Sequence, residues 1–213
     1  MPRKKGVFIA FEGLDGSGSS TQVEILTKNL NSLGIQSIAT KEPTNNIVGG
    51  LIRGVLTKEW RTSPEGLQLL FAADRAHHLK FEILPALESG KVVITDRYFF
   101  STIAFGSLNM DTDWLVDLNK KFPIPDITFL IKVRAVECIS RISQSRNRFE
   151  LFEEEKKLKR VWKTYELLAK NKKNNIQIID GEQKIDEIAK EILNILERKI
   201  FSKEKQKIAA FYA

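Results

Sequence analysis

Five short apolar runs alternate with stretches of helical spacing, and this alternation limits the folds open to the chain. The runs are Val7–Glu12, Gln36–Thr40, Val92–Asp96, Thr128–Val133 and Ile176–Ile179. Most are continuous β-branched and aromatic sequences, which is typical of strands covered on both faces in a parallel sheet. Helical spacing of apolar residues predicts helices over Ser20–Leu33, Glu65–Glu88, Phe149–Asn171 and Ile185–Ile200.

This order predicts an α/β fold with a five-stranded, mainly parallel sheet and helices on both faces. Ligands of such sheets bind at the carboxyl ends of the strands. We expect residues 1–200 to form a single domain that carries a small mobile lid at about residues 141–150. The tail, Phe201–Ala213, either extends the last helix or frays.

Composition narrows the partners and the compartment. The chain has 213 residues with 34 Lys and Arg against 27 Asp and Glu, so 34 − 27 gives a net charge of +7. A basic chain favours anionic partners, which could be nucleic acid, a membrane surface or small phosphates. Cys138 is the single cysteine, which excludes an intrachain disulfide. Because no apolar run is long enough for a membrane helix and the amino terminus is no signal peptide, we expect a cytoplasmic protein.

The strongest local motif follows the first predicted strand and precedes the first predicted helix. It reads Gly13-Leu14-Asp15-Gly16-Ser17-Gly18-Ser19-Ser20, followed by Thr21. This is the context of a phosphate-binding loop, in which backbone N–H groups converge on an anion at a helix amino terminus. The usual lysine is replaced by Ser19, and Ser20 holds the hydroxyl position that contacts Mg²⁺. The alternative is a glycine-rich turn that binds nothing.

Two further pairs of residues suggest a site at the same edge of the sheet. Asp96 ends a predicted strand, where a carboxylate associated with Mg²⁺ belongs, and Arg97 can fork onto a phosphate. A strand-end salt bridge explains this pair equally well. Phe71 and Arg75 share one helix face and could stack on and hydrogen-bond a flat base. Spacing alone favours a core Phe beside a surface Arg there.

Histidines and arginines elsewhere have simpler interpretations. The adjacent His77 and His78 are expected at the surface and not at a metal, because they diverge on a helix without nearby partners. The segment Ser143–Arg148 is predicted to be a mobile loop. Arg141, Arg146 and Arg148 either line a solvated basic loop or belong to a lid that brings arginines over phosphates on closure.

Taken together and in order, these stretches resemble thymidylate kinase, over roughly residues 6–199. The segments that carry the resemblance are FEGLDGSGSSTQ, Thr40-Lys41-Glu42-Pro43, LLFAADRAHH (69–78), DRYFFSTIAF (96–105), PDITFLIKV (125–133), RNRFE (146–150) and IIDGEQKIDEI (178–188). The resemblance implies the P-loop nucleoside monophosphate kinase fold, with ATP and dTMP as substrates, Mg²⁺ as cofactor and a homodimer as the assembly. It implies neither a nucleic-acid partner nor a membrane partner.

The resemblance also implies roles for single residues. The ATP phosphates would lie on the loop residues Gly13, Asp15, Gly16, Ser17, Gly18, Ser19, Ser20 and Thr21, and Mg²⁺ on Ser20 and Asp96. Phe71 would stack on thymine, Arg75 would hydrogen-bond its O4 and Thr102 would face its N3 edge. Arg97 and Arg53 would hold the dTMP phosphate. Asp15 would contact the 3′-hydroxyl and Phe105 would crowd the 2′ position, with Glu42 and Ser101 completing the substrate set. The catalytic set would be Asp15, Arg97, Arg146 and Arg148.

Three residues depart from the family pattern. Ser19 replaces the lysine, Gly106 stands where many bacterial members have a Gln that contacts the base, and Lys132 stands where an acidic residue is common. Phosphoryl transfer needs charge neutralisation. Our hypothesis is therefore that a lid arginine, Arg146 or Arg148, replaces the missing lysine, with Arg97 as the other candidate.

The sequence thus predicts an ATP-dependent dTMP kinase that transfers phosphate in line and without a covalent intermediate. Three alternatives stay open. Gly106 favours a kinase of broader range that also accepts dUMP and other monophosphates. Ser19 favours a nucleotide-binding pseudokinase. The net charge favours a nucleic-acid-binding protein. Against that alternative, the basic residues are scattered along the chain and are not interleaved with aromatic residues.

Overall fold

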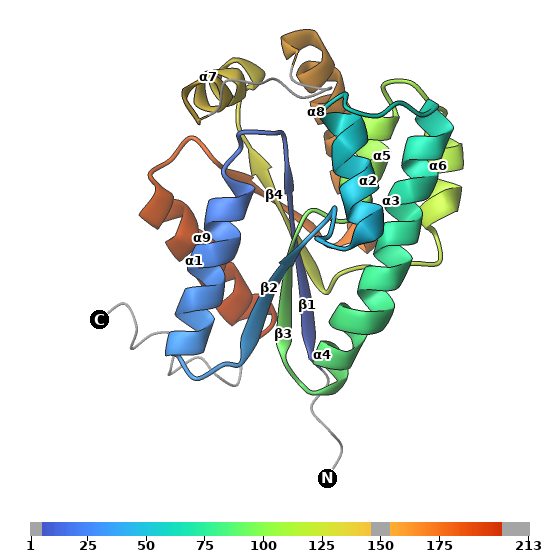
Figure 1. Ribbon diagram of the computed structural model, residues 1–213. Helices are drawn as coiled ribbons and strands as arrows, with labels where there is room; N and C mark the ends of the chain where they lie inside the picture. The colour runs from blue at the N-terminus through green and yellow to red at the C-terminus, as the bar shows by residue number, and fades with distance from the viewer. Residues whose placement is uncertain (1–5, 146–153, 202–213) are drawn as a thin grey trace.

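The computed structural model describes residues 6–145 and 154–201, which form a five-stranded parallel sheet between two layers of helices (Figure 1). The sheet order is β2-β3-β1-β4-β5, and every neighbouring pair is parallel. The strands are β1 (Val7–Gly13), β2 (Ser37–Lys41), β3 (Val92–Asp96), β4 (Ile127–Lys132) and β5 (Ile176–Asp180). The predicted strands and the α/β class are confirmed, with small shifts at the strand ends.

Both faces of the sheet are covered, as the apolar strands require. Helices α1 (Ser19–Ser32) and α9 (Ile185–Lys199) pack on one face. The other face is covered by α3 (Pro64–His78), α5 (Phe99–Gly106) and α8 (Glu155–Lys170), with α2 (Ile47–Leu56) and α6 (Thr112–Asn119) packed outside them. The central strand β1 is buried from Phe8 onward, because it has neighbours on all sides.

The order of the strands fixes where a ligand can bind. β1 lies between β3 and β4, so the chain turns to one side of β1 for β2 and β3 and to the other side for β4 and β5. The crevice at the carboxyl end of β1 is therefore the topological switch point, where ligands of doubly wound sheets bind. The loop after Gly13 lies at this point.

The helix predicted over Glu65–Glu88 is a continuous helical path that changes type along its length. α3 passes into the π-helical segment η1 (Leu79–Ile83) and then into α4 (Leu84–Glu88). Pro85 stands near the start of α4. A proline has no N–H and its ring collides with the carbonyl of the residue four positions earlier in a regular α-helix, so a wider turn before Pro85 accommodates it.

Near residue 143 the structure differs from the sequence prediction of a loop. Helix α7 (Ala135–Ser145) includes Ser143–Ser145, so the prediction of a mobile loop is wrong for these residues. Residues 146–153, which hold the remainder of the predicted lid, lie outside the described residues, as do residues 202–213. The short segment η2 (Lys172–Asn174) leads from α8 to β5. Among the described helices, none is both long and apolar enough to cross a bilayer.

Candidate active site

The loop between β1 and α1 has the backbone of an anion-binding turn. Gly16 and Gly18 have φ angles of 79° and 90°, a region that residues with a side chain rarely adopt. A Cβ on Gly16 would also lie 2.5 Å from the carbonyl oxygen of Cys138 in α7. Gly18 is the N-cap of α1. All residues of α1 lie within the described part of the chain, and its first turn carries no acidic side chain. The free N–H groups and helix dipole therefore favour a bound anion.

Three serines of this loop show what it can hold. Ser19 and Ser20 donate hydrogen bonds from their hydroxyls to the two carboxylate oxygens of Asp96, at 2.8 and 2.5 Å. The buried Oγ of Ser17 has no hydrogen-bond partner among the described residues. An orphaned hydroxyl inside a phosphate loop is suited to a phosphate oxygen, since a buried donor without a partner is costly.

The oxygen atoms of Ser20 and Asp96 also suit Mg²⁺. This ion prefers oxygen ligands, and it commonly keeps several waters while binding one or two protein groups and the substrate phosphates. Across the described residues there is no cluster of three or more His, Cys, Asp or Glu that could form a full metal cage. The donor set therefore fits an ion shared with a nucleotide and not a structural metal. Within residues 6–145 and 154–201, Asp96 makes these hydroxyl contacts and no strand-end salt bridge.

Arg97 joins the phosphate loop to helix α5. Its NH1 donates to the Gly13 carbonyl and to Ser101 Oγ, both at 3.0 Å, and its NH2 donates to Asp15 Oδ1 at 2.5 Å. Its guanidinium lies 5.2 Å from the centre of the Phe105 ring. Burial is the largest single influence and opposes its charge, but Asp15, together with Tyr165, Asp96 and Glu12, outweighs burial and raises the pKa of Arg97. Arg97 is therefore a fixed cation, with a backbone φ of 69°.

Glu12 supports the residues around the Arg97–Asp15 contact. The sequence analysis did not identify it. Its carboxylate accepts hydrogen bonds from the backbone N–H groups of Tyr98 and Ser101, at 3.0 and 3.2 Å, and from the hydroxyls of Ser101 and Tyr165. Burial raises the pKa of Glu12 to about 7, although Ser101 and Arg97 act in the opposite direction. Glu12 thereby holds the start of α5, which carries Ser101, against the phosphate loop.

A cavity of about 250 Å³ opens beside Arg97, and we call it the central cavity. All nine residues predicted to bind the substrate line it, namely Asp15, Glu42, Arg53, Phe71, Arg75, Arg97, Ser101, Thr102 and Phe105. Its wall also includes residues that the sequence did not single out for this role, namely Lys41, Pro43, Leu56, Gln68 and Tyr98, together with Asp96.

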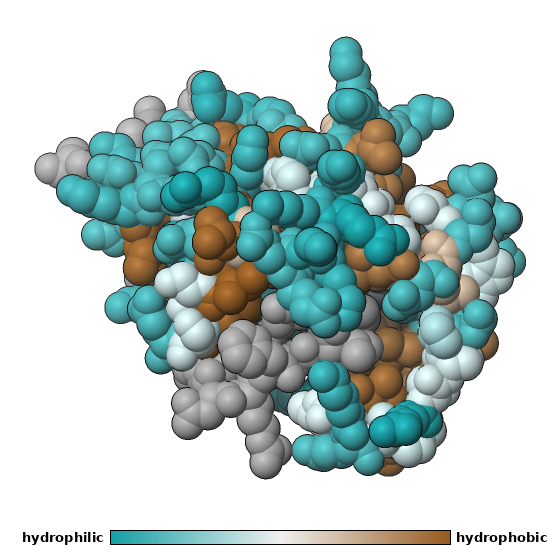
Figure 2. All heavy atoms as spheres, turned by 90° about the horizontal axis from the view of Figure 1, so that it is seen from above, coloured by the Kyte–Doolittle hydropathy of each residue, from teal (hydrophilic) through white to brown (hydrophobic). Residues whose placement is uncertain are grey.

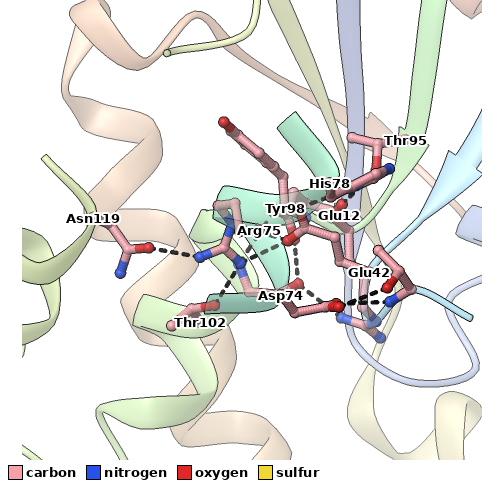
Figure 3. A network of polar contacts seen from close by, with 12 residues as sticks. Glu12, Glu42, Asp74, Arg75, His78, Thr95, Tyr98, Thr102 and Asn119 are labelled. Atoms are coloured by element: carbon pink, nitrogen blue, oxygen red, sulfur yellow. Dashed lines mark hydrogen bonds and ion pairs between the residues drawn. The ribbon is translucent and has the colours of Figure 1, made fainter. Parts of the chain in front are cut away.

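Arg75 lines the central cavity, is 1% exposed and lies within a network of polar side chains (Figure 3). Its Nε donates to Glu42 at 2.9 Å, its NH1 to Asn119 at 2.6 Å and its NH2 to Thr102 at 2.9 Å. The expectation from spacing, a core Phe with a surface Arg, is wrong: Arg75 is buried and Phe71 is half-buried at the cavity wall. A buried guanidinium needs this many acceptors, because an unpaired buried charge is costly.

A second polar layer holds the carboxyl end of β2 against α3. Asp74 accepts from the backbone N–H and hydroxyl of Thr44, at 2.7 and 2.6 Å. The ring nitrogens of His78 lie 3.1 Å from Glu42 and 2.7 Å from Thr40 Oγ1. The expectation of surface histidines therefore holds for the exposed His77 only, since His78 is buried.

Position 106 does not reach the central cavity directly. A Cβ on Gly106 would lie 2.9 Å from the methyl carbons of Leu115 and 3.2 Å from the amide carbon of Gln68. Gln68 is itself buried, lines the cavity, and has an Oε1 without a partner among the described residues. Gln68 lies three and seven residues before Phe71 and Arg75, so helical spacing was the signal that could have found it.

The predicted lid is seen only in part. Arg141, in α7, donates to Glu137 at 3.0 Å and to the carbonyl of Gly181 at 3.4 Å, just after the end of β5. Arg146 and Arg148 lie outside the described residues. Lys132 lies 6.0 Å from the Trp162 ring centre, a contact that accounts for a cation at this position.

The end of the molecule at the carboxyl ends of the strands is covered largely by hydrophilic residues, with apolar side chains between them (Figure 2).

Comparison with known proteins shows the family of this chain. The sequence profile described as thymidylate kinase matches residues 11–192. The chain belongs to the thymidylate kinase family. It is 38% identical to a probable thymidylate kinase of Thermococcus gammatolerans, over 92% of this chain and 99% of the other. It is 37% identical to the thymidylate kinase of Leptospira interrogans, over 95% of this chain and 100% of the other.

Solved structures show the same likeness. A thymidylate kinase from Candida albicans superimposes with a TM-score of 0.77 at 29% identity, over 91% of this chain and 92% of the other. One from Ehrlichia chaffeensis gives 0.72 at 28% identity, over 91% and 99%. The predicted family and P-loop kinase fold are confirmed. The chain is accordingly a kinase enzyme, of a family that uses ATP to phosphorylate dTMP.

Proposed function

We propose that this chain transfers the γ-phosphoryl group of ATP directly to a phosphate oxygen of dTMP, in a reaction that depends on Mg²⁺ and yields dTDP and ADP. One observation supports this most strongly. The Arg97–Asp15 contact at 2.5 Å lies where the phosphate loop meets a cavity lined by nine residues of the expected substrate set. A donor and an acceptor bound on its two sides would place their phosphates next to each other.

On the donor side, the backbone N–H groups of residues 13–21 would bind the ATP phosphates, with the orphaned Ser17 hydroxyl as a further donor. Ser20 and Asp96 would hold Mg²⁺. When bound, the ion supplies neutralising charge to the β- and γ-phosphate oxygens. The hydroxyls of Ser19 and Ser20 orient the Asp96 carboxylate toward the loop.

On the acceptor side, Phe71 would stack on thymine from the cavity wall and Thr102 would face its N3 edge. Arg75 would donate to O4. Its NH1 carries two N–H groups, and among the described residues only Asn119 accepts from one of them. Arg97 and Arg53 would hold the phosphate, and Arg53 already lies against the Thr44 carbonyl at the cavity rim. Asp15 would contact the 3′-hydroxyl and Phe105 would exclude a 2′-hydroxyl. Glu42 and Ser101 would act by holding Arg75 and Arg97.

The chemistry would be in-line displacement. An oxygen of the dTMP phosphate forms a bond to the γ-phosphorus while the bond to the bridging oxygen of ATP breaks, and ADP leaves. The acceptor oxygen is already anionic near neutral pH, so no base is required to remove a proton. Positioning and charge stabilisation then provide the rate, as in other phosphoryl transfers. We propose that Arg146 and Arg148 of the lid add cations on closure and help to replace the missing lysine.

The range of acceptors is the main open alternative. Gly106 is packed against Leu115, and Gln68, whose Oε1 has no partner among the described residues, lines the cavity in its place. The Candida albicans relative is described as a thymidylate kinase of broad substrate specificity. A kinase that also accepts dUMP is therefore the second candidate. A pseudokinase is less favoured, because Asp15, Asp96 and Arg97 are held in position around the loop.

We also propose a cytoplasmic homodimer. Exposed apolar side chains occur along the outer surface of the α3–η1–α4 path, at Leu69, Phe81 and Leu84. Buried contact with a second copy would cover such a surface. Light scattering after size exclusion should give twice the mass of one chain, 24.3 kDa. A mass of one chain at micromolar concentration would contradict the dimer.

The enzyme assay is ADP release from ATP and Mg²⁺ with each nucleoside monophosphate in turn. We expect dTMP to give the highest kcat/KM. Comparable values for dUMP would support the broader kinase. Absence of turnover with every monophosphate, while dTMP still binds in calorimetry, would overturn the proposal in favour of a pseudokinase.

A further inference from the structure

The phosphate loop lacks its lysine, and the structure shows what Ser19 does instead. Its side chain is buried and its hydroxyl donates to Asp96 at 2.8 Å. Ser19 therefore orients a carboxylate and supplies no charge. Phosphoryl transfer uses cationic side chains beside Mg²⁺ to stabilise the transferring group, so the charge that a loop lysine would add must come from another residue.

Among the described residues, four cationic side chains line the central cavity, and three of them are held by protein partners. Arg75 is held by Glu42, Asn119 and Thr102. Arg97 is held by Asp15, Ser101 and the Gly13 carbonyl. Arg53 donates to the carbonyl of Thr44 at 2.5 Å. These arginines have defined positions on the acceptor side and little freedom to move.

The fourth is Lys41, the last residue of β2. Its ammonium has no hydrogen bond or ion pair within the part of the chain that the structure describes. Its side chain is exposed, so it carries no burial penalty. A lysine is a compact charge on a flexible stem and can follow a group that moves during a reaction.

Register places Lys41 beside the metal-binding carboxylate. β2 and β3 pair in parallel with Lys41 opposite Asp96, and paired residues of neighbouring strands point to the same face. Lys41 and Asp96 are also the two residues that line both the central cavity and a neighbouring cavity that reaches Ser20. Lys41 therefore lies on the border between the acceptor site and the end of the loop that carries Ser20.

We propose that Lys41 supplies the cation that the phosphate loop lacks, with its ammonium over the phosphoryl group in transfer. This inference rests on the proposed function. As the bond from the acceptor oxygen to the γ-phosphorus forms and the bond to the bridging oxygen breaks, negative charge is shared among the γ-phosphoryl oxygens and the departing ADP oxygen. An ammonium at this place stabilises that charge without accepting or donating a proton.

The test is a rescue experiment in the full-length protein. We would measure kcat, and KM for ATP and for dTMP, in the wild type, Lys41→Ala, Lys41→Arg, Ser19→Lys and the double variant Ser19→Lys/Lys41→Ala. Lys28→Ala is the matched control, because Lys28 is an exposed lysine of α1 that does not line either cavity. Thermal unfolding of each variant checks folding, and Lys41→Arg keeps the charge if Lys41→Ala is unstable.

We expect Lys41→Ala to lower kcat by about 100-fold, a loss typical of removing one stabilising donor, with KM for dTMP changed much less. Ser19→Lys should then restore at least about tenfold in kcat to the Lys41→Ala variant, and Lys41→Arg should retain part of the activity. A residue with a merely structural role would not be rescued by a lysine on a different element.

Two results would overturn the inference while leaving the proposed function intact. In the first, the wild type is active and Lys41→Ala has the same kcat as the control Lys28→Ala. A strong loss of kcat in Arg146→Ala or Arg148→Ala would then assign the missing charge to the lid. The other is a higher KM for dTMP at unchanged kcat without rescue by Ser19→Lys, which would make Lys41 an acceptor-binding residue. A wild type that fails to phosphorylate any monophosphate would overturn the proposed function itself, and the inference with it.

Discussion

Arg97 donates to the carboxylate of Asp15 at 2.5 Å, and this contact links the end of β3 to the phosphate loop that follows β1. The two residues follow the carboxyl ends of neighbouring strands of the sheet. The proposed donor and acceptor sites therefore share a wall that is fixed by the parallel pairing of β1 with β3. Substitutions in this wall and in the cavity beside it should change binding, catalysis or stability in distinguishable ways.

Replacement of Arg97 by Lys should lower kcat/KM for dTMP by at least about 100-fold. A lysine keeps the charge but loses the planar fork that contacts Asp15, Gly13 and Ser101 at once, and charge-assisted hydrogen bonds are worth about 1.5–3 kcal/mol each. Steady-state kinetics with varied dTMP would measure the loss. The matched control is Arg198→Lys on the exposed surface of α9, and equal values for the two variants would show that Arg97 has no role in the reaction.

Asn119→Ala should lower the free energy of unfolding by about 1–3 kcal/mol and should also raise KM for dTMP. The substitution removes the acceptor of Arg75 NH1 and leaves a buried N–H without a partner. Urea unfolding measures the first effect and initial rates the second. Asn194→Ala, at an exposed position of α9, serves as the control. A stability loss with an unchanged KM would mean that Arg75 does not orient the acceptor.

Gln68→Leu should change stability and binding in opposite directions. The side chain is 4% exposed with an Oε1 that lacks a partner among the described residues, so an apolar replacement should raise the free energy of unfolding by about 1 kcal/mol. The same change should raise the Kd for dTMP about 3- to 10-fold, since one neutral hydrogen bond is lost. Calorimetric titration and thermal unfolding would be compared with Gln177→Leu. A lower stability together with an unchanged Kd would show that Gln68 does not face the base.

Glu12 predicts a specific dependence of stability on pH. Burial raises its pKa from the ordinary 4.5 to about 7 in the folded protein. Between these values the unfolded chain loses the proton while the folded protein keeps it. The contribution of Glu12 to stability is therefore greatest below about pH 4.5 and is lost as the pH rises through about 7. The difference corresponds to about 3 kcal/mol.

Urea unfolding of the wild type and of Glu12→Gln at several pH values from 4 to 8 tests this dependence. The quantity compared is the difference in free energy of unfolding between the two proteins. We expect that difference to shrink or reverse as the pH rises, because Gln does not ionise. The exposed Glu88→Gln is the control for general charge effects. A constant difference over the whole range would mean that folding does not raise the pKa of Glu12.

The parts of the fold that could be predicted from the sequence are those that depend on patterns of residues close together in the chain. The strands and the phosphate loop are examples, as is the shared face of Phe71 and Arg75, since spacing along one helix decides it. Helix α5 was not predicted, because Phe99–Gly106 is short and buried on almost every side, so it has no polar face to reveal its period. The end of α7 was mistaken for a loop because its residues are polar.

The supporting contacts of the site were missed for a different reason. Asn119, Glu12 and Tyr165 reach the site from distant parts of the chain, and nothing near them in sequence marks a polar partner. Arg75 was expected at the surface because a charged residue is seldom buried. Only tertiary structure shows that Glu42, Thr102 and Asn119 surround it. Lys41 became a candidate only when the register placed it opposite Asp96.

The most direct test of the central claim is the stoichiometry of products from ATP, Mg²⁺ and dTMP, measured by phosphorus NMR. Direct transfer predicts that dTDP and ADP appear in equal amounts and at equal rates, and that omission of Mg²⁺ stops both. Conversion of ATP to ADP and inorganic phosphate without dTDP, or no reaction while dTMP remains bound, would contradict direct transfer.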